Sequence, residues 1–170
     1  MVEEYLKSFQ NKMKQGYTLA VHVTSLPSGL RKYKLGIKNT KKNKLAAELV
    51  FSIQGHDMNI NNGETFVYKN VNLHSYRGQG FGTFLRALAT KAGSVAGARK
   101  GRHMGVYVYD GVTNTRSMNI GVPASTRILP PGWKPVTILS SGRWSEYNYS
   151  KANIRNVNAV LNRIVSGWKS

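Results

Sequence analysis

The sequence predicts an α+β fold in which a mixed, mostly antiparallel sheet is flanked by helices. Hydrophobic residues recur at helical spacing near both ends of the chain, and the period changes to two between them, which is typical of strands. After four predicted strands the order becomes strand, glycine-rich loop, helix, strand. The chain has 170 residues without a repeat or linker, so we predict a single domain over residues 1–170.

The first part of the predicted fold is a helix followed by a meander of strands. Residues 2–15 have the period of an amphipathic helix, and Gly16 is placed to end it. The alternating pattern then predicts strands over residues 17–26, 31–40, 45–53 and 64–74. Asn61-Asn62-Gly63 is a favourable hairpin turn before the last of these strands.

The later part of the chain combines helices with a hairpin. The pattern predicts a long helix over 82–98, a strand over 104–109, a short helix over 124–129, and a hairpin of 136–139 with 144–149. Ser150 then caps a final amphipathic helix. Its apolar stripe consists of Ile154, Val157, Leu161, Ile164 and Trp168. We expect this stripe to pack on the sheet of the same domain, or on a partner subunit.

The charge of the chain indicates a polyanionic partner. Lys and Arg number 25 against 7 Asp and Glu, which gives a formal net charge of +18. RNA, DNA or an acidic protein would suit this charge. The basic residues gather in two parts of the sequence, at Lys32, Lys34, Lys38, Lys41, Lys42 and Lys44, and at Arg99, Lys100 and Arg102. The alternative is that both clusters are solvated faces that keep the protein in solution.

Composition also excludes several kinds of site. The chain has no cysteine, which rules out disulfides, zinc sites built on thiolates and thiol nucleophiles. The histidines lack metal-ligand spacing, so we predict no metal site. The first residues are acidic and no long apolar run follows, so we expect a cytoplasmic protein without a membrane span.

A glycine-rich segment, Tyr76-Arg77-Gly78-Gln79-Gly80-Phe81-Gly82, joins the fourth predicted strand to the long helix. Backbone without Cβ atoms comes close to an anion, and the unpaired N–H groups of a first helical turn point at it. A nucleoside-triphosphate loop would need Lys and then Ser or Thr after the last glycine. The dinucleotide fingerprint spaces its glycines differently and needs an acidic residue about twenty positions later. A kinase loop joins two strands. None of these three fits.

The segment resembles the coenzyme A loop of the GNAT superfamily of N-acetyltransferases. The signature of that family is Arg or Gln, two residues, Gly, one residue, then Gly or Ala, and Arg77, Gly80 and Gly82 match it. The run 123–129, followed by Gly132-Trp133, is similar to a helix of the ribosomal-protein acetyltransferase branch. A purely structural glycine turn is the alternative interpretation.

The resemblance implies acetyl-CoA as the cofactor. Its pyrophosphate would be held by the backbone N–H groups of Arg77, Gly78, Gln79, Gly80, Phe81, Gly82 and Thr83. Its pantetheine arm would be hydrogen-bonded by Asn72, Leu73 and His74 at the end of the preceding strand. Its 3′-phosphate would meet Arg99, Lys100 or Arg102, unless these form a solvated basic turn.

Candidates for catalysis are few because carboxylates are scarce. Glu64 begins the predicted strand on which relatives often keep a glutamate base, and His74 at its end is the alternative base. The sequence departs from the family pattern at two places that bear on its activity. Ile128 stands where many relatives have a tyrosine acid, and only the turn Pro27-Ser28-Gly29 separates the first two strands, where the family places two helices.

Two functions therefore remain open. The first is an acetyl-CoA-dependent N-acetyltransferase that acts on an amine of a macromolecular or anionic partner. The second is a catalytically inactive module of the same fold that binds nucleic acid through its basic surface. The intact glycine loop favours the enzyme, whereas Ile128 and the scarcity of carboxylates favour the module.

Overall fold

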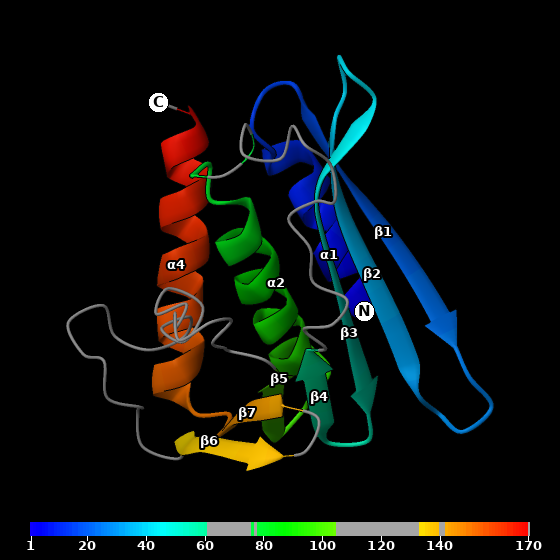
Figure 1. Cartoon of the computed structure of the whole chain (residues 1–170), viewed down its shortest axis with the longest axis vertical. Helices are drawn as coiled ribbons and strands as arrows, with labels where there is room; N and C mark the ends of the chain where they lie inside the picture. Colours follow the sequence, from blue (N-terminus) through cyan, green and yellow to red (C-terminus); the bar gives the residue numbers. More distant parts are fainter. Residues whose placement is uncertain (61–75, 77, 105–132, 140–141, 170) are drawn as a thin grey trace.

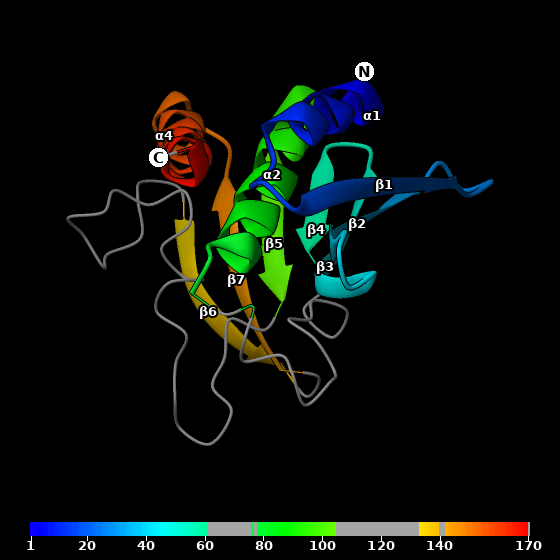
Figure 2. The same cartoon turned by 90° about the horizontal axis from the view of Figure 1, so that it is seen from above.

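The fold is a seven-stranded sheet, and the helices that the structure describes lie on one side of it (Figures 1 and 2). A computed structural model describes residues 1–60, 76, 78–104, 133–139 and 142–169. The strands are β1 (Tyr17–Ser25), β2 (Arg31–Asn39), β3 (Lys44–Gln54), β4 (Asp57–Ile60), β5 (Lys100–Met104), β6 (Trp133–Leu139) and β7 (Gly142–Asn148). Their order across the sheet is β1-β2-β3-β4-β5-β7-β6. The predicted α+β class with a mixed, mostly antiparallel sheet is confirmed.

One pair of neighbouring strands is parallel. β4 and β5 run side by side in the same direction, with Asp57 opposite Lys100 and Ile60 opposite His103, whereas the other described pairs are antiparallel. A parallel pair needs a crossover connection, and here it contains helix α2 (Phe81–Val95). The crossover helix runs back along the sheet, so the N-terminus of α2 lies beyond the end of β4, on the side toward which β4 and β5 point (Figure 1).

The meander differs from the prediction at its third turn. β3 ends at Gln54, and a two-residue turn of Gly55 and His56 leads into β4. Gly55 has φ 58°, a left-handed conformation suited to a two-residue hairpin. β4 was not predicted, because Asp and Asn have low strand propensity and occupy half of this four-residue strand. The predicted turn at 61–63 and strand over 64–74 lie outside the described residues.

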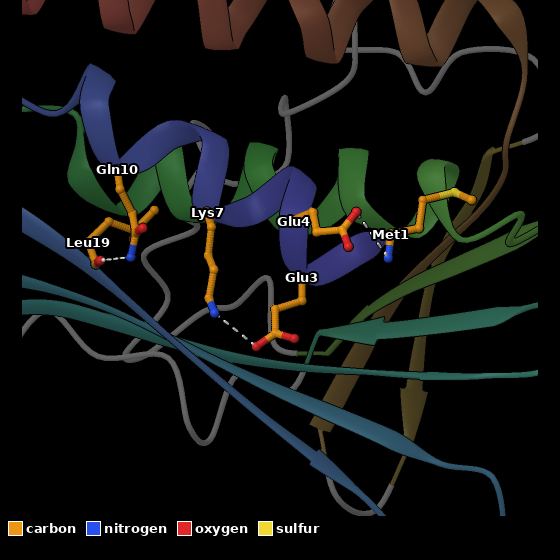
Figure 3. A network of polar contacts seen from close by, with 6 residues as sticks. All are labelled: Met1, Glu3, Glu4, Lys7, Gln10 and Leu19. Atoms are coloured by element: carbon orange, nitrogen blue, oxygen red, sulfur yellow. Dashed lines mark hydrogen bonds and ion pairs between the residues drawn. The ribbon is translucent and has the colours of Figure 1, made fainter.

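The N-terminal helix is shorter than predicted. α1 covers Val2–Lys7 and continues as a 3₁₀ helix, η1, over Ser8–Lys12, so the expected single α-helix over 2–15 is wrong. A 3₁₀ turn is a frequent way for an α-helix to end. The Gln10 amide donates to the backbone oxygen of Leu19 at 3.0 Å, which ties η1 to β1, and Lys7 pairs with Glu3 at 3.2 Å (Figure 3).

Helix α2 fills the centre of the core. Its buried side chains include Phe81, Phe84, Leu85 and Leu88, and the helix packs against β3 and β4. The helix ends three residues earlier than predicted, where Gly97 at φ 82° bonds back to Ser94. β5 begins at Lys100 instead of residue 104, because the backbone N–H groups of Arg99 and Lys100 already bond to His56. The rest of the predicted strand 104–109 lies outside the described residues.

Helix α4 (Lys151–Lys169) closes the helical layer. The backbone N–H of Asn153 donates to the Ser150 hydroxyl at 3.1 Å, which confirms the predicted cap. Among the described residues the helix packs mainly on α2, with Val157 and Leu161 buried. It reaches the sheet through the Asn153 amide, which donates to the backbone oxygen of Asn148 at the end of β7 at 2.7 Å. The predicted hairpin is present as β6 and β7, although β6 begins at Trp133, and the predicted helix over 124–129 lies outside the described residues. No helix within the described part is long and apolar enough to cross a membrane.

Gly93 lies where α2 comes close to Tyr149, the residue before the Ser150 cap of α4. A Cβ added there would contact the Tyr149 hydroxyl and would lie 3.0 Å from the side chain of Met58. That hydroxyl donates to the backbone oxygen of Thr90 at 2.7 Å. Tyr149 therefore joins the end of β7 to α2 only because residue 93 has no side chain.

We expect Gly93→Ala to lower the free energy of unfolding by about 1–3 kcal/mol, because the methyl group displaces the Tyr149 hydroxyl. Tyr149→Phe alone should cost about 1 kcal/mol. In the Tyr149→Phe background the added methyl has less to displace, so the two losses should be less than additive by at least about 0.5 kcal/mol. Urea unfolding of the four proteins measures this, and strict additivity would contradict the packing described.

Candidate functional site

The candidate site is the glycine loop at the start of α2. Gly78 has φ 79° and Gly80 has φ 86°, both left-handed conformations that other residues rarely adopt. Gly80 is also the N-cap residue of α2, a position that ordinarily has extended backbone. The backbone conformation of the loop therefore requires glycine at both positions.

The first turn of α2 presents free backbone donors. The first intrahelical bond runs from Phe84 to the oxygen of Gly80 at 2.8 Å, so the N–H groups of Phe81, Gly82 and Thr83 have no acceptor within the helix. No side chain caps this end, and the first turn contains no acidic residue. The positive end of the helix dipole therefore faces the loop without a negative side chain in its first turn.

Two side chains from distant parts of the sequence hold Gln79, the residue between the two left-handed glycines. The indole N–H of Trp168, in the last turn of α4, donates to its backbone oxygen at 2.8 Å. The ammonium group of Lys14, which follows η1, donates to its side-chain oxygen at 2.7 Å. The loop is consequently fixed from both ends of the described chain.

An aromatic cluster packs around the start of α2, next to the loop. It consists of Phe9, Tyr17, Tyr76, Phe81, Phe84 and Trp168. Phe81 lies 4.7 Å from Tyr17 and 5.6 Å from Trp168 between ring centroids, and Phe84 lies 4.9 Å from Trp168. Because these rings come from the N-terminal segment, β1, α2 and α4, the loop lies where all four meet.

A cation contacts the loop directly: the Lys14 ammonium group donates to the side chain of Gln79. A second cation, Arg86, lies further along α2 and is partly buried. Desolvation lowers its pKa to about 10, so it remains positively charged at neutral pH. Together with the helix dipole, the Lys14 charge favours an anion at the loop.

The structure separates the loop from the residues expected at a 3′-phosphate. Arg99, Lys100 and Arg102 follow the C-terminal end of α2, and the glycine loop precedes its N-terminal end. A helix of 15 residues is about 22 Å long. Arg99 and Lys100 are therefore too far from the loop for that role, and the exposed Arg102 lies further along β5.

The remaining predicted site residues divide into two groups. Gly78, Gln79, Gly80, Phe81, Gly82 and Thr83 form one continuous loop and helix start. Glu64, Asn72, Leu73, His74 and Arg77 lie outside the described residues, as do Ile128 and the run 123–129. No group of three potential metal ligands occurs among the residues that the structure describes.

Lys14 and Trp168 were not predicted as loop residues. They are 65 and 89 positions from Gln79 in the sequence, and neither stands in a motif that includes the glycines. Trp168 was predicted only as part of an apolar stripe. The indole N–H of Trp168 was the available signal for this contact, because a buried indole N–H usually has a hydrogen-bond acceptor.

Comparison with known proteins gives a structural likeness but no sequence match. The sequence matches no protein-family model and no curated protein at a significant level. Among solved structures, the chain is similar to one described as a putative acetyltransferase from Agrobacterium tumefaciens, with 13% identity and a TM-score of 0.37. The match covers 84% of this chain and 83% of that one. At this identity and TM-score, the likeness assigns neither an activity nor a ligand.

We expect Trp168→Phe to lower the free energy of unfolding by about 1 kcal/mol, because it leaves the Gln79 backbone oxygen without its donor and keeps an aromatic ring against Phe81 and Phe84. Amide hydrogen exchange in the segment 78–81 should become faster than in the middle of α2. Equal stability and unchanged exchange would show that the indole N–H does not hold the loop.

Proposed function

We propose that this protein is an acetyl-CoA-dependent N-acetyltransferase whose glycine loop binds the pyrophosphate of the cofactor. The observation that carries the proposal is the conformation of the loop: two left-handed glycines lead directly into an uncapped helix N-terminus. This arrangement directs several backbone N–H groups to one side, where a pyrophosphate can accept from them.

The residues present fit such a group in both shape and charge. Backbone without Cβ atoms at Gly78 and Gly80 allows an anion to approach the N–H groups of the loop. Nothing lies within 4 Å of a Cβ added at Gly78, whereas at Gly80 the nearest atom would be Ile164 at 3.4 Å. Gly78 therefore faces open space, and Gly80 has α4 behind it.

The role proposed for the chain in the reaction is mainly positional. Bound acetyl-CoA would supply an acyl group activated as a thioester. The loop amides and Lys14 would fix the pyrophosphate end, so that the reactive end has a defined place relative to the sheet edge. We propose Glu64 and His74 as alternative general bases for the ammonium group of the acceptor.

The proposed acceptor is an amine carried by a macromolecular or anionic partner. The net charge of +18 exceeds what the few negative charges of one cofactor require. The scarcity of acidic residues also makes the protein a poor host for a free polyamine. An amine that belongs to a larger anionic molecule is consistent with both features.

Gly78→Ala and Gly97→Ala form a matched pair that tests the loop. Both glycines have left-handed φ, 79° and 82°, and neither has an atom within 4 Å of an added Cβ. Each substitution should cost about 1 kcal/mol of stability, because alanine is disfavoured in this conformation. Only Gly78→Ala should weaken acetyl-CoA binding, by about tenfold from a micromolar dissociation constant.

Isothermal titration calorimetry with acetyl-CoA measures both variants against the parent. Equal affinities of the two variants would remove the loop from the binding site. Absence of heat with the parent protein would overturn the cofactor assignment as a whole.

Transfer activity separates the enzyme from an inactive binding module. We expect the parent to release free thiol from acetyl-CoA in the presence of an amine-bearing polyanion. One of the two substitutions Glu64→Gln and His74→Asn should abolish this release, because only one of the two residues acts as the base. Glu64→Gln should leave acetyl-CoA affinity unchanged, since Glu64 is not among the residues proposed to hold the cofactor. Tight cofactor binding without any thiol release, over a panel of amine acceptors, would favour the module.

A further inference from the structure

The two basic clusters of the sequence lie on one face of the sheet. Strand register places Lys32 of β2 opposite Ser52 of β3, Ser52 opposite Asn59 of β4, and Asn59 opposite Arg102 of β5. Residues paired in this way point to the same side of a sheet. A single row across four strands therefore joins residues that are 70 positions apart in the sequence.

This face is the one that the described helices leave uncovered. α1, α2 and α4 all lie on the opposite side (Figure 2), where Tyr33, Phe51 and Ile60 are buried. The alternating residues on the outer side, Lys32, Lys34 and Lys38, are exposed, and so is Arg102. We name the surface formed by these four residues, together with Thr18, His22, Thr24, Ser52, Asn59 and Lys100, the outer sheet face.

The charge of the outer sheet face is strongly positive. Lys41, Lys42 and Lys44 extend it at the turn between β2 and β3, and all three are exposed. The acidic residues at outer positions of the described strands are Glu48, Asp57 and Glu146. The register places Asp57 opposite Lys100 and Glu146 opposite Arg102, and Glu48 pairs with Lys34 at 3.5 Å. The Lys34 side chain nevertheless keeps 53% of its surface exposed. Basic residues thus greatly outnumber acidic ones.

The dimensions of the face suit a nucleic-acid backbone. Residues two apart on a strand are separated by about 6.7 Å, so Lys32 to Lys38 spans about 20 Å. The row from β2 to β5 is about 14 Å wide, since neighbouring strands are about 4.8 Å apart. Along a duplex, 20 Å corresponds to about six base pairs. Several phosphates can therefore meet cations of this face at the same time.

The side chains of the face favour a duplex over a single strand. Proteins that hold single strands stack bases on aromatic rings, usually Phe, Tyr or Trp. At the outer positions of the described strands β1 to β5 no Phe, Tyr or Trp occurs, and His22 is the one ring. The other residues there are mostly Lys, Arg, Thr, Ser and Asn, together with Ala20, Gly36, Glu48, Val50 and Asp57. Such a surface contacts phosphates without unstacking bases, and it carries little information about sequence.

We propose that the outer sheet face is a docking surface for the phosphate backbone of double-stranded nucleic acid, bound without sequence preference. This inference deepens the proposed function by naming the anionic partner that presents the acceptor amine. It rests on its own observation, the register that joins Lys32 to Arg102, and it does not require the glycine loop to bind acetyl-CoA.

Fluorescence anisotropy with a labelled 24-base-pair duplex of mixed sequence tests the proposal. The parent should bind at 50 mM salt and lose about a thousandfold in affinity by 200 mM, as expected for about six phosphate contacts. Lys32→Gln with Lys38→Gln should reduce the salt slope by about 1.8, and Arg102→Gln alone by about 0.9. The triple variant should bind at least tenfold more weakly at 50 mM.

A matched control removes the same charges from the helical side. Lys7, Lys151 and Arg155 are exposed on α1 and α4, and their replacement by Gln should leave duplex affinity within about twofold. An equal loss in both triple variants would overturn the outer sheet face as the site. An effect of the β2 pair without an effect of Arg102→Gln would overturn the single continuous surface.

Other ligands and the glycine loop complete the test. A single strand of the same length should bind more weakly than the duplex, and tighter binding would overturn the choice of duplex. Poly-L-glutamate that binds as tightly as the duplex would point to an acidic protein instead. Gly78→Ala should keep full duplex affinity, and the outer-face triple variant should keep full acetyl-CoA affinity, so failure of either site is seen separately.

Discussion

The left-handed backbone on both sides of Gln79 constrains the rest of this structure. Such a conformation is held only when surrounding contacts determine it. Here the contacts come from Trp168 on the backbone oxygen and Lys14 on the side chain, with aromatic rings below. The short 3₁₀ segment before Lys14 and the packing of α4 along α2 both serve to deliver these two donors.

The parallel pair of β4 and β5 divides the molecule into two chemically different sides. Its crossover helix covers one face of the sheet and places the glycine loop beyond the end of β4. The same register aligns basic side chains on the opposite face. A small anion and a large one would thus be bound by different groups. Backbone amides and a helix dipole lie on one side, and exposed basic side chains lie on the other.

The sequence predicted what depends on local pattern. Strands β1, β2 and β3 were found because their alternation is regular, and Ser150 was recognised as a cap because its hydroxyl precedes an apolar stripe. Contacts over long sequence separations had no local signal. Three features depend on strand register and helix placement, which periodicity does not encode. They are the hydrogen bond from Trp168 to Gln79, the packing of α4 on α2, and the placement of Lys32 and Arg102 in one row of the sheet.

The bond between Trp168 and Gln79 also orders events during synthesis. The chain leaves the ribosome from its N-terminus, and Trp168 emerges 89 residues after the residue it holds. At rates of about 5–20 residues per second, the loop waits roughly 4–18 s for this donor. Lys14 and the strands of the meander are already available by then. A ligand that depends on the loop would therefore find its site only once α4 has been translated and has docked.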